Sequence, residues 1–410
     1  NSNQLCVECQ LDGDCGAGYC VNEECVDCMT DADCPAGTIC DGNGECISQG
    51  YGVVTWGPST KGGDSSSVSS QLSSGVTEIF STSQAFAALK VDGSVVTWGN
   101  NQGGGSVSSS VSAQLSSGVV EIFSTNSAFA ALKSDGSVIT WGASSYGGDS
   151  SSVSAQLSSG VTEIFSSSGA FAALKSDGTV VTWGGSGLGG DSSSVASQLS
   201  SIVQINGNYA AFAALKSDGS VVTWGFPSHG GDKSIVIVDK NLSIIKSSSV
   251  SDQLNNGVIN IYSNGYGFVA LKDDGSVVTW GDSSKGGDSS SVRDRLTSGV
   301  KEVFSSSRAF AALKDDGSVV TWGANGNLMD SVEDIESFNR KLSSGVLNIT
   351  STFDTFAALK DDGSLVFWGS VHPNIHNKSQ TILGISEIFA NENHYAAIKT
   401  DGSLIAIYPA

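Results

Sequence analysis

The chain has 410 residues, a formal net charge of −21 and nine cysteines, and its length allows more than one domain. Strong acidity without a basic cluster disfavours nucleic acid or an anionic membrane surface as a partner, because both require Lys and Arg to displace counterions. No stretch reaches the roughly 18 apolar residues of a membrane span, and no signal segment precedes the cysteines. We therefore expect a mature, soluble protein.

Residues 1–48 are predicted to form a disulfide-rich module, followed by a second domain over residues 49–410. The first stretch holds every cysteine and no Lys or Arg, which is typical of small secreted or cell-surface domains from an oxidising compartment. It contains two copies of a four-cysteine unit, and each copy is expected to form two bridges worth ~2–4 kcal/mol apiece. The cysteines assigned to these bridges are Cys9, Cys15, Cys20, Cys25, Cys28, Cys34, Cys40 and Cys46.

Cys6 is left over and is predicted to be unpaired or paired outside the two units. Its context, Asn1–Cys6, matches the closing segment Asp41–Cys46, which indicates the tail of a third unit whose remainder lies upstream. Pairing with another molecule is the alternative. Zinc binding by the Cys-x-x-Cys pairs is less favoured, because the repeat accounts for those cysteines and no histidine is nearby. The module resembles the tandem cysteine-rich repeats of many secreted proteins.

From Gly52 onward a single phrase recurs, consisting of two strands, an Asp-Gly turn, a third strand ending in Trp-Gly, and a Gly/Ser loop. The tryptophans repeat at intervals of 41 to 56 residues, and Tyr408 is predicted to take the same position in the last copy. Such a period indicates a repeat array. The tryptophans are Trp56, Trp98, Trp141, Trp183, Trp224, Trp280, Trp322 and Trp368.

One copy illustrates the expected elements. Residues 160–166 alternate apolar and polar and predict a first strand, 170–175 a second, and 179–183 a third. Asp177-Gly178 supplies the hairpin turn, because glycine accepts the positive φ that such turns need. The same pair occurs in eight copies, so eight hairpins are expected. The other seven pairs begin at Asp92, Asp135, Asp218, Asp274, Asp316, Asp362 and Asp401.

The loop after each Trp-Gly, such as Gly147–Gly160, is predicted to be a short helix capped by Asp149 or Ser150, or an irregular loop. Two copies carry longer insertions there, at Lys233–Ser249 and at Met329–Leu342, and the second of these is the more convincing helix.

These patterns predict an all-β fold, a β-propeller of about eight three-stranded blades, with seven possible, and short helical loops. The second and third strands are apolar on both faces, and radial packing of blades covers both. Two strands, Val53–Trp56 and Leu404–Tyr408, exceed the hairpins. One is expected to close the ring, and the other to add a fourth strand to the closing blade or to pair with a neighbouring molecule.

The phrase Gly-Val-x-x-Ile…Ala-Leu-Lys-x-Asp-Gly-x-Val-x-x-Trp-Gly resembles the propellers of the regulator of chromosome condensation superfamily over residues 51–410. The compact period is closest to its secreted bacterial branch, which includes a β-lactamase-inhibitor propeller with seven blades. The resemblance implies a ring of blades and a loop surface that binds proteins. Nucleotide exchange by the chromatin-bound members conflicts with a disulfide module and an acidic surface, and fold alone does not fix function.

No catalytic activity is expected, because the sequence lacks a nucleophile elbow and a phosphate-binding loop. His372 and His376 are spaced like metal ligands on a helix, but Pro373 favours a loop. No cofactor is predicted. Calcium is possible at acid pairs of the module or at the Asp of the Gly-Gly-Asp loops, although one acid per blade makes capping the better interpretation. The acids concerned are Asp12, Asp14, Asp31, Asp33, Asp64, Asp149, Asp191, Asp232 and Asp288.

Asn241, Asn348 and Asn377 are acceptors for N-glycosylation. The first hypothesis for function is an extracellular structural or adhesive protein, whose propeller is a rigid scaffold within a larger assembly of subunits. The alternative is a secreted recognition module that binds a protein or a glycan on one loop face. Tyr146, Phe226, His229 and the 233–249 insertion are its candidate binding patch.

Overall fold

A computed structural model of the chain describes residues 19–21, 24–26, 38–40, 46–48, 50–233, 235–237, 244–246, 248–324, 335–369 and 383–407. Only the backbone is described for the strands before residue 50 and for residues 235–237, 244–246, 248–249 and 335–337. The chain forms two compact units, Asn1–Gly160 and Val161–Ala410. Among the described residues, no helix is long and apolar enough to cross a membrane.

The cysteine-rich stretch of the first unit contains two short antiparallel strand pairs. β1 (Tyr19–Val21) pairs with β2 (Glu24–Val26), and β3 (Thr38–Cys40) pairs with β4 (Cys46–Ser48). Cys20 is opposite Cys25 in the first pair, and Cys40 is opposite Cys46 in the second. All cysteine side chains, that of Cys6 included, lie outside the described part of the chain, so the bridges remain a prediction.

The rest of the first unit consists of two blades, each a sheet of three antiparallel strands joined in sequence order. A short helix, α1 (Ser109–Gln114), lies in the connection between them. The strands are β5 (Val76–Ser81), β6 (Ala85–Lys90) and β7 (Val95–Gly99) in the first blade, and β8 (Val119–Ser124), β9 (Ala128–Lys133) and β10 (Val138–Gly142) in the second.

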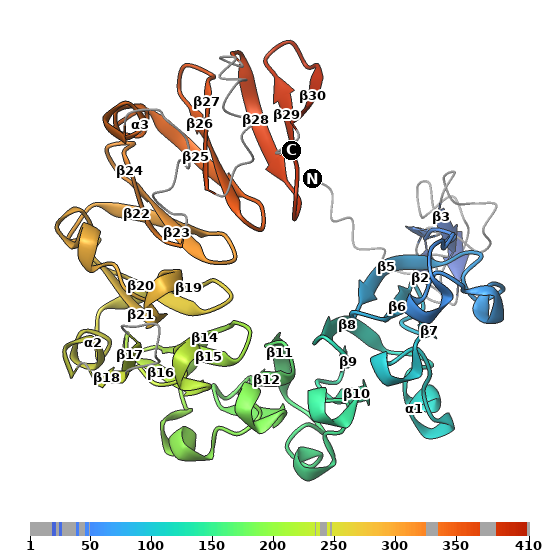
Figure 1. Cartoon of the computed structure of the whole chain (residues 1–410). Helices are drawn as coiled ribbons and strands as arrows, with labels where there is room; N and C mark the ends of the chain where they lie inside the picture. The colour runs from blue at the N-terminus through green and yellow to red at the C-terminus, as the bar shows by residue number, and fades with distance from the viewer. Residues whose placement is uncertain are drawn as a thin grey trace. The chain divides into compact units, whose positions relative to one another are not determined.

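The second unit holds six further blades, which follow one another from β11 to β30 (Figure 1). The first three comprise β11 (Val161–Ser166), β12 (Ala170–Lys175) and β13 (Val180–Gly184); β14 (Ile202–Gly207), β15 (Ala211–Lys216) and β16 (Val221–Gly225); and β19 (Val258–Ser263), β20 (Gly267–Lys272) and β21 (Val277–Asp282). The last three comprise β22 (Val300–Ser305), β23 (Ala309–Lys314) and β24 (Val319–Gly323); β25 (Val346–Ser351), β26 (Thr355–Lys360) and β27 (Leu365–Gly369); and β28 (Ile385–Ala390), β29 (Tyr395–Lys399) and β30 (Leu404–Ile407). The described residues thus form eight propeller blades, and the predicted all-β propeller fold is confirmed.

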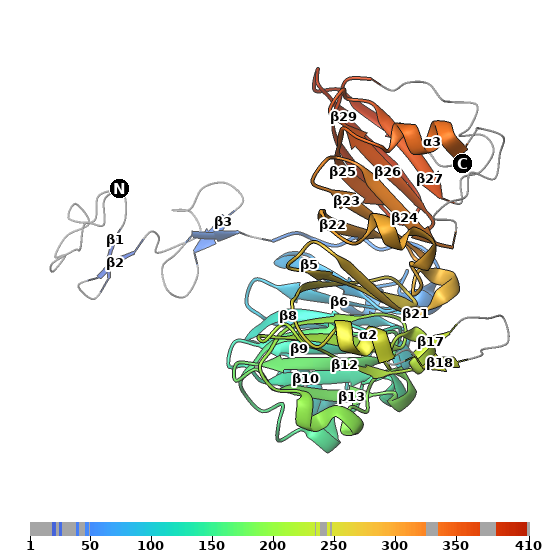
Figure 2. The same ribbon diagram turned by 90° about the vertical axis from the view of Figure 1, so that its left-hand side faces the viewer.

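The two insertions differ in structure. In the first, β17 (Ile235–Ile237) and β18 (Ile244–Lys246) form a hairpin, and β17 pairs in parallel with β21, so this blade has five strands (Figure 2). Helix α2 (Ser248–Gln253) follows it. In the second, the predicted helix is present as α3 (Ile335–Lys341), and residues 325–334 lie outside the described part.

The core of each of the first seven blades rests on one aromatic pair. The phenylalanine of the second strand is directly opposite the tryptophan of the third, as Phe129 is opposite Trp141, and the two rings stack with centroids 5.1 Å apart. The indole Nε1 donates to the carbonyl of Gly104 in the preceding loop at 3.1 Å. Gly104 has φ +94°, and a Cβ there would lie 2.7 Å from the Phe129 ring. Only glycine therefore permits this close approach.

The loops after Trp-Gly contain short helices, as predicted, and in most copies these are 3-10 helices. In the third copy Ser151–Val153 forms a single turn of 3-10 helix whose N-cap residue is Ser150, and Asp149, one residue earlier, accepts the Ser151 N–H through Oδ1 at 2.9 Å. The carbonyl of Leu157 then accepts the Val138 N–H at 2.9 Å. This bond holds the loop against the third strand.

The last copy corrects the sequence prediction by one residue. Ile407, not Tyr408, is opposite Tyr395 and takes the tryptophan position. Leu404–Ile407 is moreover the third strand of the last blade, so it is not a surplus strand. The other predicted surplus strand is wrong as well, because Val53–Trp56 forms no strand and the neighbouring Tyr51 makes an isolated bridge to Val76.

Candidate binding surface on the second unit

The turns between the first and second strands of the six blades in the second unit are joined by backbone hydrogen bonds. In each of the first five turns an N–H donates to a carbonyl in the turn of the next blade, at 2.7–3.3 Å. The bonds run from Ser168 to Tyr209, Tyr209 to Gly265, Gly265 to Ser307, Ser307 to Phe353, and Phe353 to Glu392. These turns therefore form one continuous edge, which we call the turn belt.

Buried asparagines connect the turn belt to the loops after Trp-Gly. Asn208 Oδ1 accepts the N–H groups of Ala210 and Ala211, while its Nδ2 donates to the carbonyl of His229 at 2.7 Å. Asn264 makes the same set of bonds in the next blade and donates to the carbonyl of Lys285 at 2.7 Å. Both asparagines are buried, so they fix the backbone at His229 and Lys285 relative to the turns.

Four aromatic side chains meet on this frame. The rings of Tyr209 and Tyr266 pack edge to face with centroids 5.1 Å apart. The ring centroid of His229 lies 5.1 Å from that of Tyr266 and 5.5 Å from that of Phe226. Lys285 Nζ is 3.4 Å from the centroid of the Tyr266 ring, a cation–π contact. We call these five residues the aromatic cluster.

The charges around the aromatic cluster are partly balanced. Lys285 Nζ lies 3.4 Å from a carboxylate oxygen of Asp282. Burial, and then the positive charge of Lys285, lower the pKa of His229 below its ordinary value of 6.5, while Asp282 opposes this shift. Since a lowered pKa favours the neutral imidazole at pH 7, His229 presents a neutral ring. Burial raises the pKa of Tyr209, which keeps its hydroxyl protonated.

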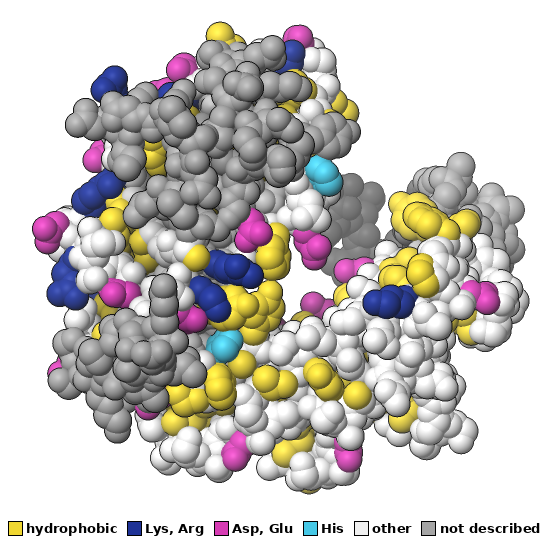
Figure 3. All heavy atoms as spheres, viewed as in Figure 1, with side chains coloured by type: hydrophobic (Ala, Val, Ile, Leu, Met, Phe, Trp, Pro, Cys, Tyr) yellow, Lys and Arg dark blue, Asp and Glu magenta, His cyan; other side chains and the backbone are white. Residues whose placement is uncertain are grey.

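The aromatic cluster offers both apolar surface and hydrogen-bonding groups. Phe226 is 48% exposed and Tyr209 is 39% exposed, whereas Tyr266, His229 and Lys285 are half-buried. Figure 3 shows hydrophobic, basic and histidine side chains gathered over the ends of β14, β19 and β20. Rings of this kind bind apolar groups and sugar faces while their polar ends accept or donate hydrogen bonds.

The residues of the predicted patch have separate locations. Phe226 and His229 lie together in the aromatic cluster, whereas Tyr146 is a half-buried residue of the first unit, where its carbonyl accepts the Thr125 hydroxyl at 2.9 Å. Sequence reasoning missed Tyr209 and Tyr266. Comparison of the copies would have found them, because these turn positions carry Ser, Asn, Gly or Gln in the first three blades.

Other candidate sites are less developed. Asn348 is exposed on β25, and its Oδ1 accepts the Ile349 N–H at 2.8 Å. Asn241, Asn377, His372 and His376 lie outside the described residues.

Like Asp149, three more loop acids accept an N–H from the residue two positions further on. The bond to this backbone group is the main cause of a lowered pKa at Asp64 and Asp191. The bonds are Asp64 to Ser66, Asp191 to Ser193 and Asp288 to Ser290.

These bonds give the loop acids a structural role, since each carboxylate accepts the first N–H of the 3-10 helix that follows it. Within the described residues, no group of three or more His, Cys, Asp or Glu side chains is arranged to hold a metal ion. The acid pairs of the cysteine module lie outside those residues, so calcium binding there stays a prediction.

No protein-family model matches the chain, and no curated protein matches it significantly. Solved structures similar to it are propeller proteins. The ectodomain of the receptor kinase ACR4 from Arabidopsis thaliana is 14% identical, over 68% of this chain and 90% of that one, with a TM-score of 0.33. The ectodomain of the receptor kinase CR4 from Physcomitrella patens is 15% identical, over 68% of each chain, with a TM-score of 0.36. Prp20p from Saccharomyces cerevisiae, the yeast RCC1, is 17% identical, over 70% of this chain and 71% of that one, with a TM-score of 0.36. Similarity at this level concerns the type of fold alone.

Proposed function

We propose that the chain is an extracellular recognition module that binds a partner protein at the aromatic cluster. The observation that carries this proposal is the convergence of Tyr209, Phe226, His229 and Tyr266 on one edge of a unit. Tyrosine and other aromatic residues are enriched where proteins bind tightly, because they bury a large area at a small cost in side-chain entropy. The turn belt supplies the rigid support that such a site needs.

Two further features support the proposal. The composition of residues 1–48 is typical of a secreted or cell-surface protein. Binding without catalysis is favoured because the charged groups of the site already satisfy one another, with Lys285 placed between Asp282 and the Tyr266 ring.

Capture of extracellular proteins by the full chain, followed by affinity measurement, tests this function. Phe226→Ala and Tyr266→Ala are each expected to weaken binding by roughly 5- to 30-fold, the usual effect of removing an important interface aromatic. Leu347→Ala is the matched control, because Leu347 is a 60% exposed apolar residue on β25 outside the cluster. Equal binding by all three variants would exclude the aromatic cluster as the site, and capture of glycans alone would change the ligand class.

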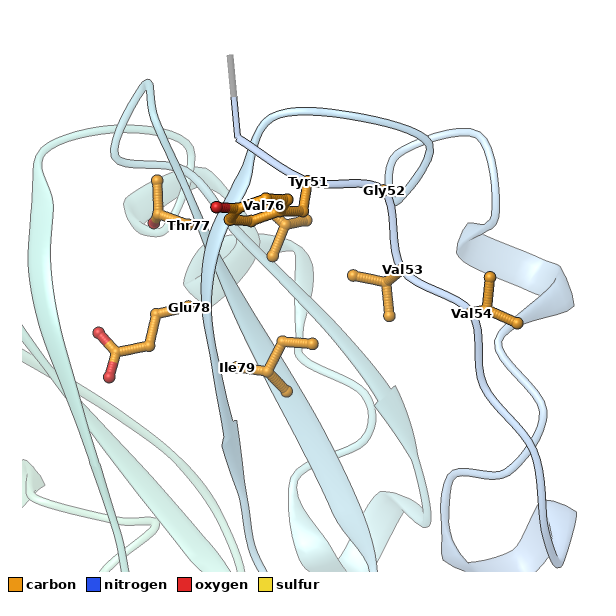
Figure 4. Close-up of a pocket in the computed structure, with 8 residues that line it drawn as sticks. All are labelled: Tyr51, Gly52, Val53, Val54, Val76, Thr77, Glu78 and Ile79. Carbon is orange, nitrogen blue, oxygen red and sulfur yellow. The ribbon is translucent and has the colours of Figure 1, made fainter. Parts of the chain in front are cut away.

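The second candidate function is a structural or adhesive role within an assembly of subunits. The observation that favours it is the segment Val53–Trp56 (Figure 4), which repeats the third-strand sequence of the later copies without the Asp-Gly hairpin that precedes it in them.

A further inference from the structure

Tyr209 is held in the turn belt on two sides. Its N–H donates to the Gly265 carbonyl at 3.3 Å, and its ring covers the same glycine, because a Cβ at Gly265 would lie 2.6 Å from Tyr209 Cε2. The ring of Tyr266 packs against it edge to face. Only glycine at position 265 leaves room for this arrangement. The Tyr209 ring therefore has a fixed place on the edge, where it is 39% exposed.

Three charged side chains act on the Tyr209 hydroxyl. Burial is the main cause of its raised pKa, and the charge of Arg308 lowers that pKa whereas those of Asp354 and Glu392 raise it. Each of the three residues lies in the turn of a later blade. Figure 1 shows the blades of the second unit following an arc, so the turn belt is curved as well. This curvature brings the charges of three later turns to one tyrosine.

The polar groups around Tyr209 leave their hydrogen-bonding capacity largely unused. Among the described residues, the Tyr209 hydroxyl and the Arg308 guanidinium make no hydrogen bond, and neither Asp354 nor Glu392 forms an ion pair. The Asp354 carboxylate accepts only the Ser307 hydroxyl, at 3.3 Å. A ligand at this part of the belt thus meets free carboxylates beside an exposed aromatic ring.

The aromatic cluster already holds one cation in this kind of setting. Lys285 Nζ lies 3.4 Å from the centroid of the Tyr266 ring and 3.4 Å from a carboxylate oxygen of Asp282. The negative face of the ring attracts the cation, and the carboxylate supplies the opposite charge. Tyr209 and Asp354 offer the same two partners. No cation from the described part of the chain lies over the Tyr209 ring.

We propose that the partner protein supplies an arginine or lysine side chain, whose charged group lies over the Tyr209 ring and pairs with the Asp354 carboxylate. This inference rests on the proposed recognition function and names the chemistry of its ligand. Charge complementarity supports it, because the chain carries a net charge of −21 and the two acids outnumber Arg308 at the site. Opposite charges steer such partners together. Phe353, beside Asp354 and 43% exposed, offers apolar surface to the methylene groups of the side chain.

The site is built by the second unit alone. Each turn from Tyr209 to Phe353 has both of its bonded neighbours among the turns of that unit, which run from Ser168 to Glu392. The edge is therefore defined without reference to the first unit. Within the site, Arg308 competes for the same carboxylates. Removal of its charge should make the site more receptive to a cation from outside.

A peptide titration of the full chain tests the charge of the ligand. The probes are two glycine peptides with a central arginine or a central citrulline, which has nearly the same shape without the charge. The NMR signals of the isotope-labelled Tyr209 ring, assigned with Tyr209→Phe, are expected to move with the arginine peptide and far less with the citrulline peptide. Equal shifts with both peptides, or no shift at Tyr209, would overturn the proposal.

Three variants locate the contact in the same titration. Asp354→Asn should weaken binding of the arginine peptide by roughly two- to fivefold, the usual size of an exposed charge pair, and Arg308→Gln should strengthen it. Glu302→Gln is the matched control, since Glu302 is an exposed carboxylate on β22 outside the turn belt. Equal loss in Asp354→Asn and Glu302→Gln would show that only the overall charge matters, and would overturn the assignment to Asp354.

Affinity for the captured partner protein separates this inference from the recognition function. Binding to the wild type is expected to weaken as salt is added, because salt screens the charge pair, and Asp354→Asn should reduce both the affinity and its salt dependence. If Phe226→Ala weakens capture but Asp354→Asn changes neither quantity, the recognition function stands and the basic side chain is excluded. If neither variant loses affinity, the recognition function is overturned, and this inference with it.

Discussion

Replacement of Trp224 by alanine is expected to be among the most damaging single changes in the second unit. The indole is 2% exposed, stacks on Phe212 with centroids 5.3 Å apart, and donates from Nε1 to the Gly189 carbonyl at 3.0 Å. Loss of a buried Trp typically costs ~3–5 kcal/mol through lost burial and the cavity left behind. The unpaired carbonyl adds about 1 kcal/mol or more, so we expect a total of about 4–6 kcal/mol.

Trp56→Ala is the matched comparison, because it removes the same side chain from the same repeat position where it is 84% exposed. At concentrations where the chain is monomeric, its cost should stay within about 0.5 kcal/mol. Urea unfolding followed by circular dichroism, together with protection of the blade amides from hydrogen exchange, measures both variants. If Trp224→Ala and Trp56→Ala cost the same, the aromatic stack and its hydrogen bond do not hold the blades together.

Three further results are expected. Gly104→Ala should lose more than about 1 kcal/mol in thermal or urea unfolding, because it combines a positive φ with a clash against a buried ring, whereas Gly187→Ala, which meets open space, should stay within about 0.5 kcal/mol. Hydrogen bonds from the serine two residues later lower the pKa of Asp135 below 3.8, so the stability that its ionised form adds should be present above that pH and be lost as the pH falls through the folded value. The advantage of the wild type over Asp135→Ala in urea unfolding should accordingly shrink in strong acid, and a difference independent of pH would refute this account. Lys285→Met should raise the pKa of His229 in an NMR titration, since it removes a neighbouring positive charge, and an unchanged titration would show that burial alone sets that pKa.

The repeat made most of the fold predictable. An Asp-Gly turn occurs once in each of the eight complete copies, and a Trp-Gly strand end follows it in seven of them, so these pairs located eight hairpins and their order. The last copy was misread because Tyr408 is aromatic and adjoins the position that Ile407 fills; the strand register, set by the turn at Asp401, decides between them. The short loop helices were predicted too, but the sequence did not distinguish a 3-10 turn, as at Ser151–Val153, from a turn of α-helix.

The candidate site was only half visible in the sequence. Phe226 and His229 stand out in a Ser/Gly-rich loop, but their neighbours Tyr209 and Tyr266 come from turns of two different blades. Strand periodicity says nothing about which turns share an edge. That information lies in the backbone bonds between turns and in the amide side chains of Asn208 and Asn264, which the sequence shows only as small polar residues.

The turn belt separates what holds the unit together from what its edge displays. Each of its bonds is made by main-chain atoms, and the side chains at the bonded positions include serine, tyrosine, glycine, phenylalanine and glutamate. A substitution there leaves the junction between neighbouring blades chemically the same, provided the turn itself is kept. Such positions can accumulate change under selection for a new ligand while the scaffold stays folded, so copies of one ancestral unit could diverge into faces with different preferences.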